Sequence, residues 1–445
     1  MKTFPGGIHP PDSKDLAKDR AIDPLDPPRV AIFPMSQHIG VPCTPVVGKK
    51  DRVVKGQVVG QPDPENPRRF VSAPVHASIS GTVTAVQPMP HPLGKAVLAV
   101  VVESDGEDAW AEGVPSPVDP ASLDAAAIKS RIQEAGIVGM GGAAFPTHVK
   151  ISPPPDKPID TVILNAAECE PYLTCDYRLM LERPDALVDG LMLLGRVLGA
   201  KSFWVGVEAN KLDAAEALRQ AARETPVCVA VCETKYPQGA EKQLIYALTG
   251  RKVPAGGLPL EVGVVVQNVA TALAVREAVI EGKPLIERVV TVTGDGVERP
   301  SNLLVRLGTP IGELLDAARA AADARKVIAG GPMMGIAQAR RDVPVIKGTS
   351  GLLVQKEAAA PAWGACIRCG RCVEACPMNL LPNSIGIACE AQDIDAVADT
   401  AILDCFECGS CTYVCPAKRP MVQWVKWGKA QLSLRRERQK KPKAS

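Results

Sequence analysis

Eight of the fourteen cysteines stand in two runs of identical spacing near the C-terminal end, and a proline follows each run. The pattern C-x2-C-x2-C-x3-C-P holds cubane iron-sulfur clusters, because the first three thiolates of a run bind one cluster and the fourth binds the other. The sequence therefore predicts two [4Fe-4S] clusters whose ligands cross between the runs. The first cluster takes Cys366, Cys369, Cys372 and Cys415, and the second takes Cys405, Cys408, Cys411 and Cys376.

Zinc is the competing metal for these thiols, because C-x2-C pairs also suit tetrahedral zinc sites. Zinc ribbons use two such pairs, however, and give no reason for duplicated runs of four. Gly370 and Gly409 supply the backbone freedom that a chain curled around a cube requires. The linking segment 383–401 is predicted to form helices. Six cysteines lie outside the runs: Cys43, Cys169, Cys175, Cys228, Cys232 and Cys389. Most of them are expected to be buried, reduced thiols.

Two loops in the middle of the chain are candidates for a common ligand site. A glycine loop with Gly139, Gly141 and Gly142 exposes backbone N–H groups to which a phosphate or a flat ring can bind, and Lys150 adds a cation. An acidic turn, Asn165-Ala166-Ala167-Glu168-Cys169-Glu170-Pro171, follows the strand-like TVIL. Ligands of open parallel sheets bind outside the carboxyl ends of the strands. The two loops are therefore predicted to converge on one ligand.

The elements that position these residues are expected in several units, because 445 residues correspond to about three ordinary domains. The hydrophobic content of 46% is typical of a globular protein, and the net charge of +2 argues against a general nucleic-acid-binding surface. Apolar runs from TVILNA to VGVVVQN alternate with helical patterns, which predicts a mainly parallel sheet.

The predicted fold class is multidomain, α/β and β. The expected parts are an N-terminal β domain (1–110), a Rossmann-like α/β domain (120–285), a β-grasp module or simple spacer (286–342), a helical two-cluster domain (360–420) and a basic amphipathic tail (421–445). In the tail, Trp424 and Trp427 could dock at a membrane interface or on an integral partner. A solvated basic tail is the alternative.

The chain is expected to stay in the cytoplasm. It has no run of about 18 apolar residues to span a bilayer, and the N-terminal MKTFPGGIHPPDSKD lacks the apolar core of a signal peptide. Reducing conditions there favour metal ligation over disulfides.

Two segments resemble known modules. Residues 75–83, VHASISGTV, resemble the barrel-sandwich fold of lipoyl and biotinyl carriers. A carrier needs an exposed lysine at its hairpin tip, and the equivalent PENPRRF offers none, so we expect a structural module without a prosthetic group. Residues 288–339 resemble the soluble-ligand-binding β-grasp modules found beside flavin subunits.

The glycine loop and the acidic turn resemble the flavin subunit of respiratory complex I, whose pattern is GRGGAGFPTG followed by NADESEP. The resemblance implies that FMN and nicotinamide lie between the loops. By position, Glu170 and Glu241 would approach the nicotinamide dinucleotide, and Asn268 would close over the flavin phosphate. The residues that the resemblance assigns to FMN itself are Gly139, Gly141, Gly142, Lys150, Asn165 and Glu168.

Ordered motifs along nearly the whole chain are similar to the RnfC family: FPGGIHPP, QHIGVPCTP, GMGGAAFPTHVK, NAAECEPYLTCDYRLML and the cysteine runs ending in KRPMVQW. The resemblance implies a peripheral subunit on the cytoplasmic face of the cell membrane, in a complex that couples ferredoxin and NAD chemistry to ion pumping. Its partners would be integral-membrane and iron-sulfur subunits, with ferredoxin reached through one of them. FMN is then required, because hydride carries two electrons and a cluster accepts one.

Two other functions stay open. A related corrinoid reductase also joins a flavin domain to two clusters, although here the β-grasp segment precedes the cysteine runs. The second alternative function is that of a relay or scaffold subunit without nicotinamide binding. Ala167 and Ala240 support it, because they replace acidic residues of the complex I pattern.

Overall fold

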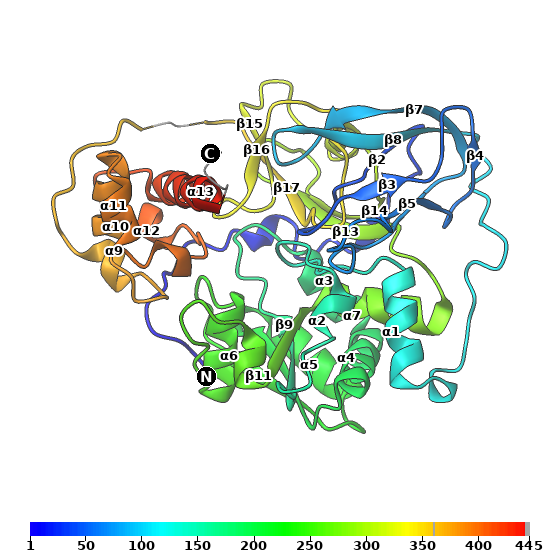
Figure 1. Cartoon of the computed structure of the whole chain (residues 1–445), viewed down its shortest axis with the longest axis horizontal. Coiled ribbons are helices and arrows are strands. Elements are labelled where there is room, and N and C mark those ends of the chain that lie inside the picture. Colours follow the sequence, from blue (N-terminus) through cyan, green and yellow to red (C-terminus); the bar gives the residue numbers. More distant parts are fainter. Residues whose placement is uncertain (359–360, 441–445) are drawn as a thin grey trace.

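Buried apolar strands alternate with helices in the middle of the chain and form a four-stranded parallel sheet in the computed structural model, which describes residues 1–358 and 361–440 (Figure 1). The order is β11-β10-β9-β12. Every pairing in it is parallel, as predicted from the alternation. The strands are β9 (Thr161–Ala166), β10 (Ser202–Glu208), β11 (Val227–Cys232) and β12 (Val264–Asn268).

Helices cover both faces of this sheet, because its side chains alternate between two apolar cores. Val162 and Leu164 of β9 join a core with α1 (Ala125–Glu134), α4 (Pro184–Leu198), α5 (Leu212–Ala221) and α7 (Val269–Arg276). Ile163 faces the other core, with α6 (Glu241–Thr249). Two shorter helices lie at the loops, α2 (Thr147–Lys150) and α3 (Cys175–Glu182).

The N-terminal β unit consists of two antiparallel sheets around a shared core. One sheet has the order β2-β8-β7-β4 and the other β3-β5-β6. Their bounds are β2 (Val30–Pro34), β3 (Cys43–Pro45), β4 (Arg52–Val53), β5 (Val58–Pro62), β6 (Val75–His76), β7 (Gly81–Pro90) and β8 (Ala96–Ser104). Residues 1–24, which the predicted range 1–110 groups with this unit, run along other units: Lys2 and Ile8 pair with the parallel-sheet unit.

A six-stranded sheet with the order β1-β14-β13-β17-β15-β16 follows, and α8 (Ile311–Ala317) belongs to the same unit. It takes strands from outside the predicted range 286–342. β17 (Gly351–Gln355) lies between β13 and β15, where pairing on both sides buries its apolar run, and β1 (Ile22–Pro24) forms an edge. The other strands are β13 (Glu287–Thr293), β14 (Ser301–Arg306), β15 (Lys326–Ala329) and β16 (Ile336–Gln338).

The cysteine runs lie in a separate helical unit, at the left of Figure 1. Its helices are α9 (Arg371–Glu374), α10 (Pro382–Glu390), α11 (Ile394–Ala398), α12 (Ser410–Tyr413) and α13 (Met421–Lys440). The described part of the predicted tail is α13, and it packs on α10 and α11. Trp424 and Trp427 are partly buried against that core, so their rings are engaged within the chain.

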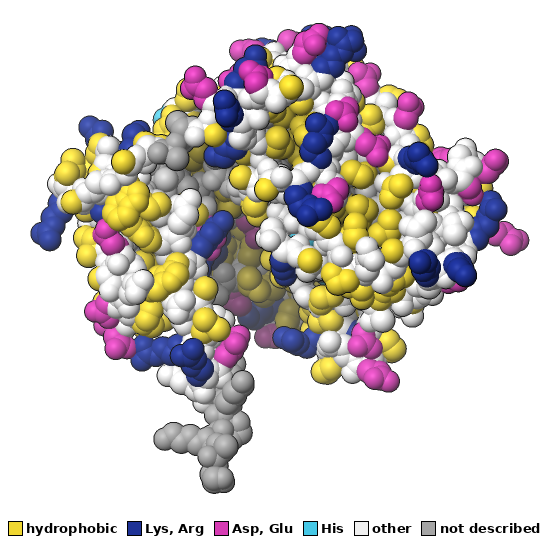
Figure 2. Space-filling model, turned by 90° about the horizontal axis from the view of Figure 1, so that it is seen from above, with side chains coloured by type: hydrophobic (Ala, Val, Ile, Leu, Met, Phe, Trp, Pro, Cys, Tyr) yellow, Lys and Arg dark blue, Asp and Glu magenta, His cyan; other side chains and the backbone are white. Residues whose placement is uncertain are grey.

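Single turns of 3-10 helix complete the fold at Lys14–Leu16, Pro120–Ser122, Ala209–Lys211, Pro259–Val262 and Ile402–Asp404, and a π-helical turn covers Glu277–Glu281. Lysine, arginine and acidic side chains are scattered over the face seen in Figure 2, as the near-zero net charge leads one to expect. Among the described helices, none is both long and apolar enough to cross a membrane.

Candidate functional site

The carboxyl ends of β9 and β12 bring the two predicted loops together. The chain adds β10 and β11 on one side of β9 and then returns to place β12 on its other side, so the strand order reverses between β9 and β12. Asn165 and Asn268 are register partners at the ends of these two strands. A reversal of this kind opens a crevice beyond the strand ends, which is where open α/β sheets bind ligands.

The glycine loop is held by few bonds of its own. Gly139 N donates to Phe145 O at 2.9 Å and Met140 N donates to Thr271 Oγ1 at 2.8 Å. In the described chain, the next four amides, 141–144, donate to no protein acceptor. A β-carbon on Gly141 would lie 2.7 Å from Asn268 Nδ2, whereas one on Gly142 would meet no atom within 4 Å. The loop is therefore packed against Asn268 at Gly141 and has amides without a protein acceptor, which suits an anion such as a phosphate.

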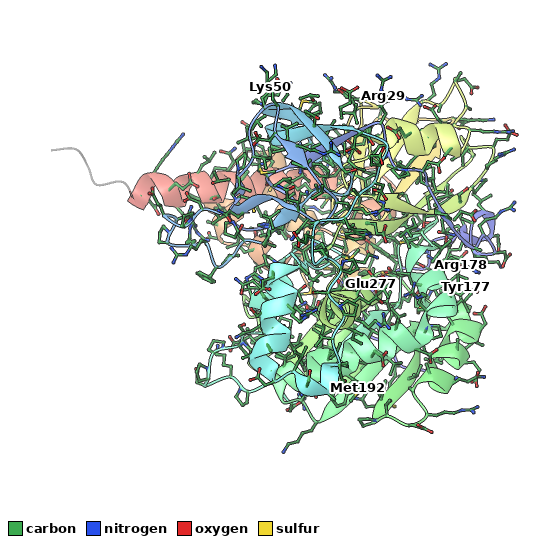
Figure 3. All side chains as sticks on the ribbon, turned by 90° about the vertical axis from the view of Figure 1, so that its right-hand side faces the viewer. Arg29, Lys50, Tyr177, Arg178, Met192 and Glu277 are labelled. Atoms are coloured by element: carbon green, nitrogen blue, oxygen red, sulfur yellow. The ribbon has the colours of Figure 1, made fainter. Side chains whose placement is uncertain are left out.

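The acidic turn is held by the start of α3. Glu168 has a left-handed backbone with φ of 46°, and its carboxylate accepts hydrogen bonds from Asp176 N at 2.7 Å and Tyr177 N at 3.2 Å. It thereby satisfies amides that a helix start leaves free. Lys14 Nζ lies 3.8 Å from the same carboxylate. Tyr177 itself extends from α3 toward α5 and donates to Asp213; Figure 3 shows it beside Arg178.

Asp176 links the acidic turn to the glycine loop. Asn268 Nδ2 donates to Asp176 Oδ2 at 2.6 Å, and Asn268 Oδ1 caps α7 by accepting from Ala270 N at 2.9 Å. The side chain of Asn268 thus has partners on both its oxygen and its nitrogen, and it supports Gly141 from behind. Burial raises the pKa of Asp176 to about 7, and the charge of Glu168 contributes to that rise.

The remaining predicted residues form two pairs and one link between units. Lys150 Nζ donates to Glu241 Oε1 at 2.6 Å, and Asn165 Nδ2 donates to Gly239 O at 2.7 Å, which places the start of α6 beside β9. The carboxylate of Glu170 accepts from the amides of Met333 at 3.1 Å and Met334 at 2.7 Å, in the β15–β16 connection.

Burial raises the pKa of Glu170 to about 7. The carboxylate of Glu170 is thus buried and hydrogen-bonded to a neighbouring unit, whereas the Glu241 side chain is 38% exposed to solvent.

The eight cysteines line two cavities, four in each, with the crossed grouping that the spacing predicts. One cavity is lined by Cys366, Cys369, Cys372 and Cys415. The other is lined by Cys376, Cys405, Cys408 and Cys411. Burial raises the pKa of Cys405 to about 11 and that of Cys411 to about 12, so these thiols ionise readily only when a metal takes the place of the proton. Four cysteines around a small, largely apolar cavity are a donor set suited to a cubane cluster.

The two cavities differ in their surroundings. Cys376 and Cys408 are each 8% exposed, and an apolar cluster joins Cys408 to Ile8, Tyr236 and Met333. Gln243 of α6 donates to Pro377 O at 3.1 Å. In the first quartet none of the four cysteines is buried, and Cys369 is exposed.

Three residues of this region could not be found from the sequence. Lys14 lies in no motif, and the motif that contains Asp176 gives that residue no role, so only their neighbours in space place them in the site. Tyr236 stands in a loop whose sequence signals only a turn. The FPGGIHPP segment is a family motif, but no sequence pattern indicates that it reaches the cysteines.

Family models match four segments of the chain. Residues 2–107 match the RnfC barrel sandwich hybrid domain, 132–277 the Nuo51 FMN-binding domain, 289–337 the SLBB domain and 365–419 the 4Fe-4S dicluster domain. These matches confirm the predicted set of a barrel-sandwich, a flavin-binding, a soluble-ligand-binding and a two-cluster domain.

Similar proteins cover almost the whole chain. It is 46% identical to the C subunit of the proton-translocating ferredoxin:NAD(+) oxidoreductase complex of Clostridium ljungdahlii, over 99% of this chain and 96% of that protein. It is 46% identical to the C subunit of the Na(+)-translocating ferredoxin:NAD(+) oxidoreductase complex of Acetobacterium woodii, over 98% of each chain. For the C subunit of the ion-translocating oxidoreductase complex of Rhodobacter capsulatus the identity is 41%, over 97% of this chain and 84% of that protein.

Among solved structures, a chain of the NAD+-reducing [NiFe]-hydrogenase in the H2-reduced state is similar at 20% identity and a TM-score of 0.49, over 74% of this chain and 68% of that one. The extent and the identity of the matches to the three bacterial proteins show the relationship directly: this chain belongs to the RnfC family, the C subunits of ion-translocating oxidoreductase complexes.

Proposed function

We propose that this chain is the peripheral subunit that passes electrons between NAD(H), FMN and two [4Fe-4S] clusters in a ferredoxin:NAD oxidoreductase complex. When bound, FMN accepts two electrons as hydride and the clusters carry electrons singly. The observation that carries the proposal is the position of one group of four cysteines, Cys376, Cys405, Cys408 and Cys411, here called the Cys376 quartet. It lies against the parallel-sheet unit that holds the glycine loop and the acidic turn, which is called the flavin-binding unit below. Electron carriers held in these places would be neighbours.

In this proposal the glycine loop holds FMN. The amides after Gly141 bind its phosphate, and Lys150 adds a cation. Asn268 acts from behind by fixing Gly141 and α7. Asn165 and Glu168 shape the floor of the crevice by holding Gly239 and α3. The residues proposed to contact or shape the FMN site are Gly139, Gly141, Gly142, Lys150, Asn165, Glu168 and Asn268.

The nicotinamide dinucleotide is proposed to approach Glu170 and Glu241. The Glu241 side chain is more exposed to solvent than that of Glu170, and it forms an ion pair with Lys150. A bound phosphate would compete with Glu241 for Lys150. Glu170 would act through its carboxylate, which accepts hydrogen bonds from the amides of Met333 and Met334 and so fixes one wall of the crevice.

The cluster ligands are proposed as grouped by the two cavities. The Cys376 quartet faces the flavin-binding unit, and the quartet with exposed Cys369 is the one within reach of a partner protein. By name, the relatives above are subunits of proton- and Na(+)-translocating complexes, and this supports a place for the chain at the cytoplasmic face of the membrane beside integral-membrane and iron-sulfur partners.

Anaerobic isolation tests the proposal. Flavin, iron and inorganic sulfide are measured first, and NADH is then added while the flavin absorption and the paramagnetic signal of reduced clusters are recorded. Bleaching of the flavin band together with that signal is expected. Bound zinc, or the absence of inorganic sulfide, would overturn the redox role.

A relay protein without nicotinamide binding is the second candidate, and Ala167 and Ala240 in the acidic loops favour it. It predicts flavin and clusters that dithionite reduces and NADH does not.

A further inference from the structure

Residues far away in the sequence pack against the backbone around the Cys376 quartet. The N-terminal segment 4–8 and the loop after β11 meet there, and they form a two-stranded contact: Ile8 N donates to Tyr236 O at 2.8 Å and Tyr236 N donates to Ile8 O at 2.9 Å. On the other side, Gly7 N donates to Ala375 O at 3.0 Å. The segment therefore bonds the flavin-binding unit and the cysteine unit at once.

The glycines of this segment are needed for its close approach. Gly6 and Gly7 have φ of 73° and 82°, a region that side chains disfavour. A β-carbon on Gly6 would lie 2.8 Å from Cys376 O, and one on Gly7 would lie 2.8 Å from Tyr236 O. Since both contacts are to backbone atoms, any larger residue would push the two units apart.

Tyr236 reaches a cysteine of the quartet directly. Its side chain is 2% exposed, and its hydroxyl donates to Cys408 O at 2.7 Å. The neighbouring Lys235 fastens the same loop to the segment, because its Nζ donates to Phe4 O at 2.9 Å and lies 4.7 Å from the centre of the Phe4 ring.

We propose that Tyr236 and segment 4–8 form a clamp that positions the Cys376 quartet on the flavin-binding unit, and that the Tyr236 hydroxyl raises the reduction potential of the cluster held there. The inference rests on the proposed function. A reduced cluster carries one more negative charge than the oxidised one, and a hydroxyl dipole aimed at the carbonyl of a ligand residue stabilises that charge. Tyr236 is thus a positioning residue that tunes the site.

Tyr236→Phe tests the tuning. A redox titration with dithionite, followed by paramagnetic resonance on the cluster-loaded chain, gives the potential of each cluster. One neutral hydrogen bond of about 1 kcal/mol changes an equilibrium up to about fivefold. The constant for one-electron reduction of one cluster should therefore fall about two- to fivefold, or ~20–40 mV at 59 mV per tenfold change. Tyr177→Phe, which removes a hydroxyl bond to Asp213 in the same unit, should leave both potentials unchanged.

Gly6→Ala tests the clamp separately. Hydrogen exchange at the amides of Gly7 and Ile8 in the loaded chain should speed up about tenfold or more. Gly106→Ala is the matched control, because Gly106 has φ of 79° and open space around it. Unchanged potentials in Tyr236→Phe refute the tuning, and unchanged exchange in Gly6→Ala refutes the clamp. A wild-type chain that binds no clusters would instead refute the proposed function.

Discussion

Gly141 and Gly142 are adjacent but have opposite surroundings, and this separates flavin binding from folding. An added methyl group at Gly141 would strike three atoms of Asn268 at 2.7–2.8 Å, whereas at Gly142 it would enter open space. Gly142→Ala should therefore change the free energy of unfolding of the cofactor-free chain by less than about 0.5 kcal/mol. Gly141→Ala should lower it by about 1–3 kcal/mol, the usual cost of overpacking.

Flavin binding should respond differently. If FMN occupies the space beside Gly142, the methyl group overpacks the ligand by a similar ~1–3 kcal/mol, which weakens FMN binding roughly 5- to 150-fold. Quenching of flavin fluorescence on titration into the cofactor-free chain measures the dissociation constant, and thermal unfolding measures stability. Gly48→Ala, which would gain only a 3.8 Å contact with Asp51, serves as the control for both.

The result that refutes this reasoning is a Gly142→Ala chain that binds FMN as tightly as the wild type. It would show that the free amides of the loop do not face the flavin. A large loss of stability in the same variant would show instead that the loop packs more tightly than the structure indicates.

Three further predictions concern single groups. Burial raises the pKa of Asp176 from 3.8 to about 7, so between these pH values the native state holds a proton that the unfolded state has lost. The free energy of unfolding should therefore fall as the pH rises from about 4 to 7. Asp176→Asn should flatten that fall, as measured by chemical denaturation over this pH range. Cys376→Ser and Cys415→Ser should each remove about half of the iron and different paramagnetic signals, while Cys389→Ala, a buried thiol outside both cavities, should keep both clusters. Loss of different signals from Cys376→Ser and Cys408→Ser would contradict the crossed grouping. Glu241→Gln should raise the KM for NADH severalfold and change stability by less than about 1 kcal/mol, because its ion pair is partly exposed; an unchanged KM would remove Glu241 from the dinucleotide site.

The local patterns of the sequence predicted much of this molecule. The parallel sheet follows from apolar runs such as TVILNA and their alternation with helices, and the crossed cysteine grouping follows from spacing alone. Both depend on local patterns that recur along the chain, apolar runs in one case and cysteine spacing in the other. The place of β17 could not be predicted in the same way, because an apolar run of five residues does not say which strands will pair with it.

Long-range contacts were the part that sequence could not supply. Lys14 reaches Glu168 from a segment without motif, and Tyr236 bonds Cys408 across 172 positions. Such contacts depend on how the folded units pack against one another, and the hydrophobic periodicity of the sequence does not indicate them. The acidic turn was placed correctly at a strand end, but the carboxylate of Glu168 was expected beside a ligand, whereas it also caps α3.

The C-terminal helix shows why a basic, tryptophan-containing segment need not be a free tail. The cysteine unit is small, and units of about 75 residues rarely gain enough stability from one apolar core. Val425 and Leu432 of α13 complete that core, and Trp424 packs edge-on against Trp363 at 5.4 Å while Arg419 lies over its ring. Because burial keeps the free thiols protonated, ligation of a metal must release protons and adds folding free energy of its own. The helix and the clusters therefore stabilise one unit together, and removal of α13 should weaken cluster retention even though it contains no ligand.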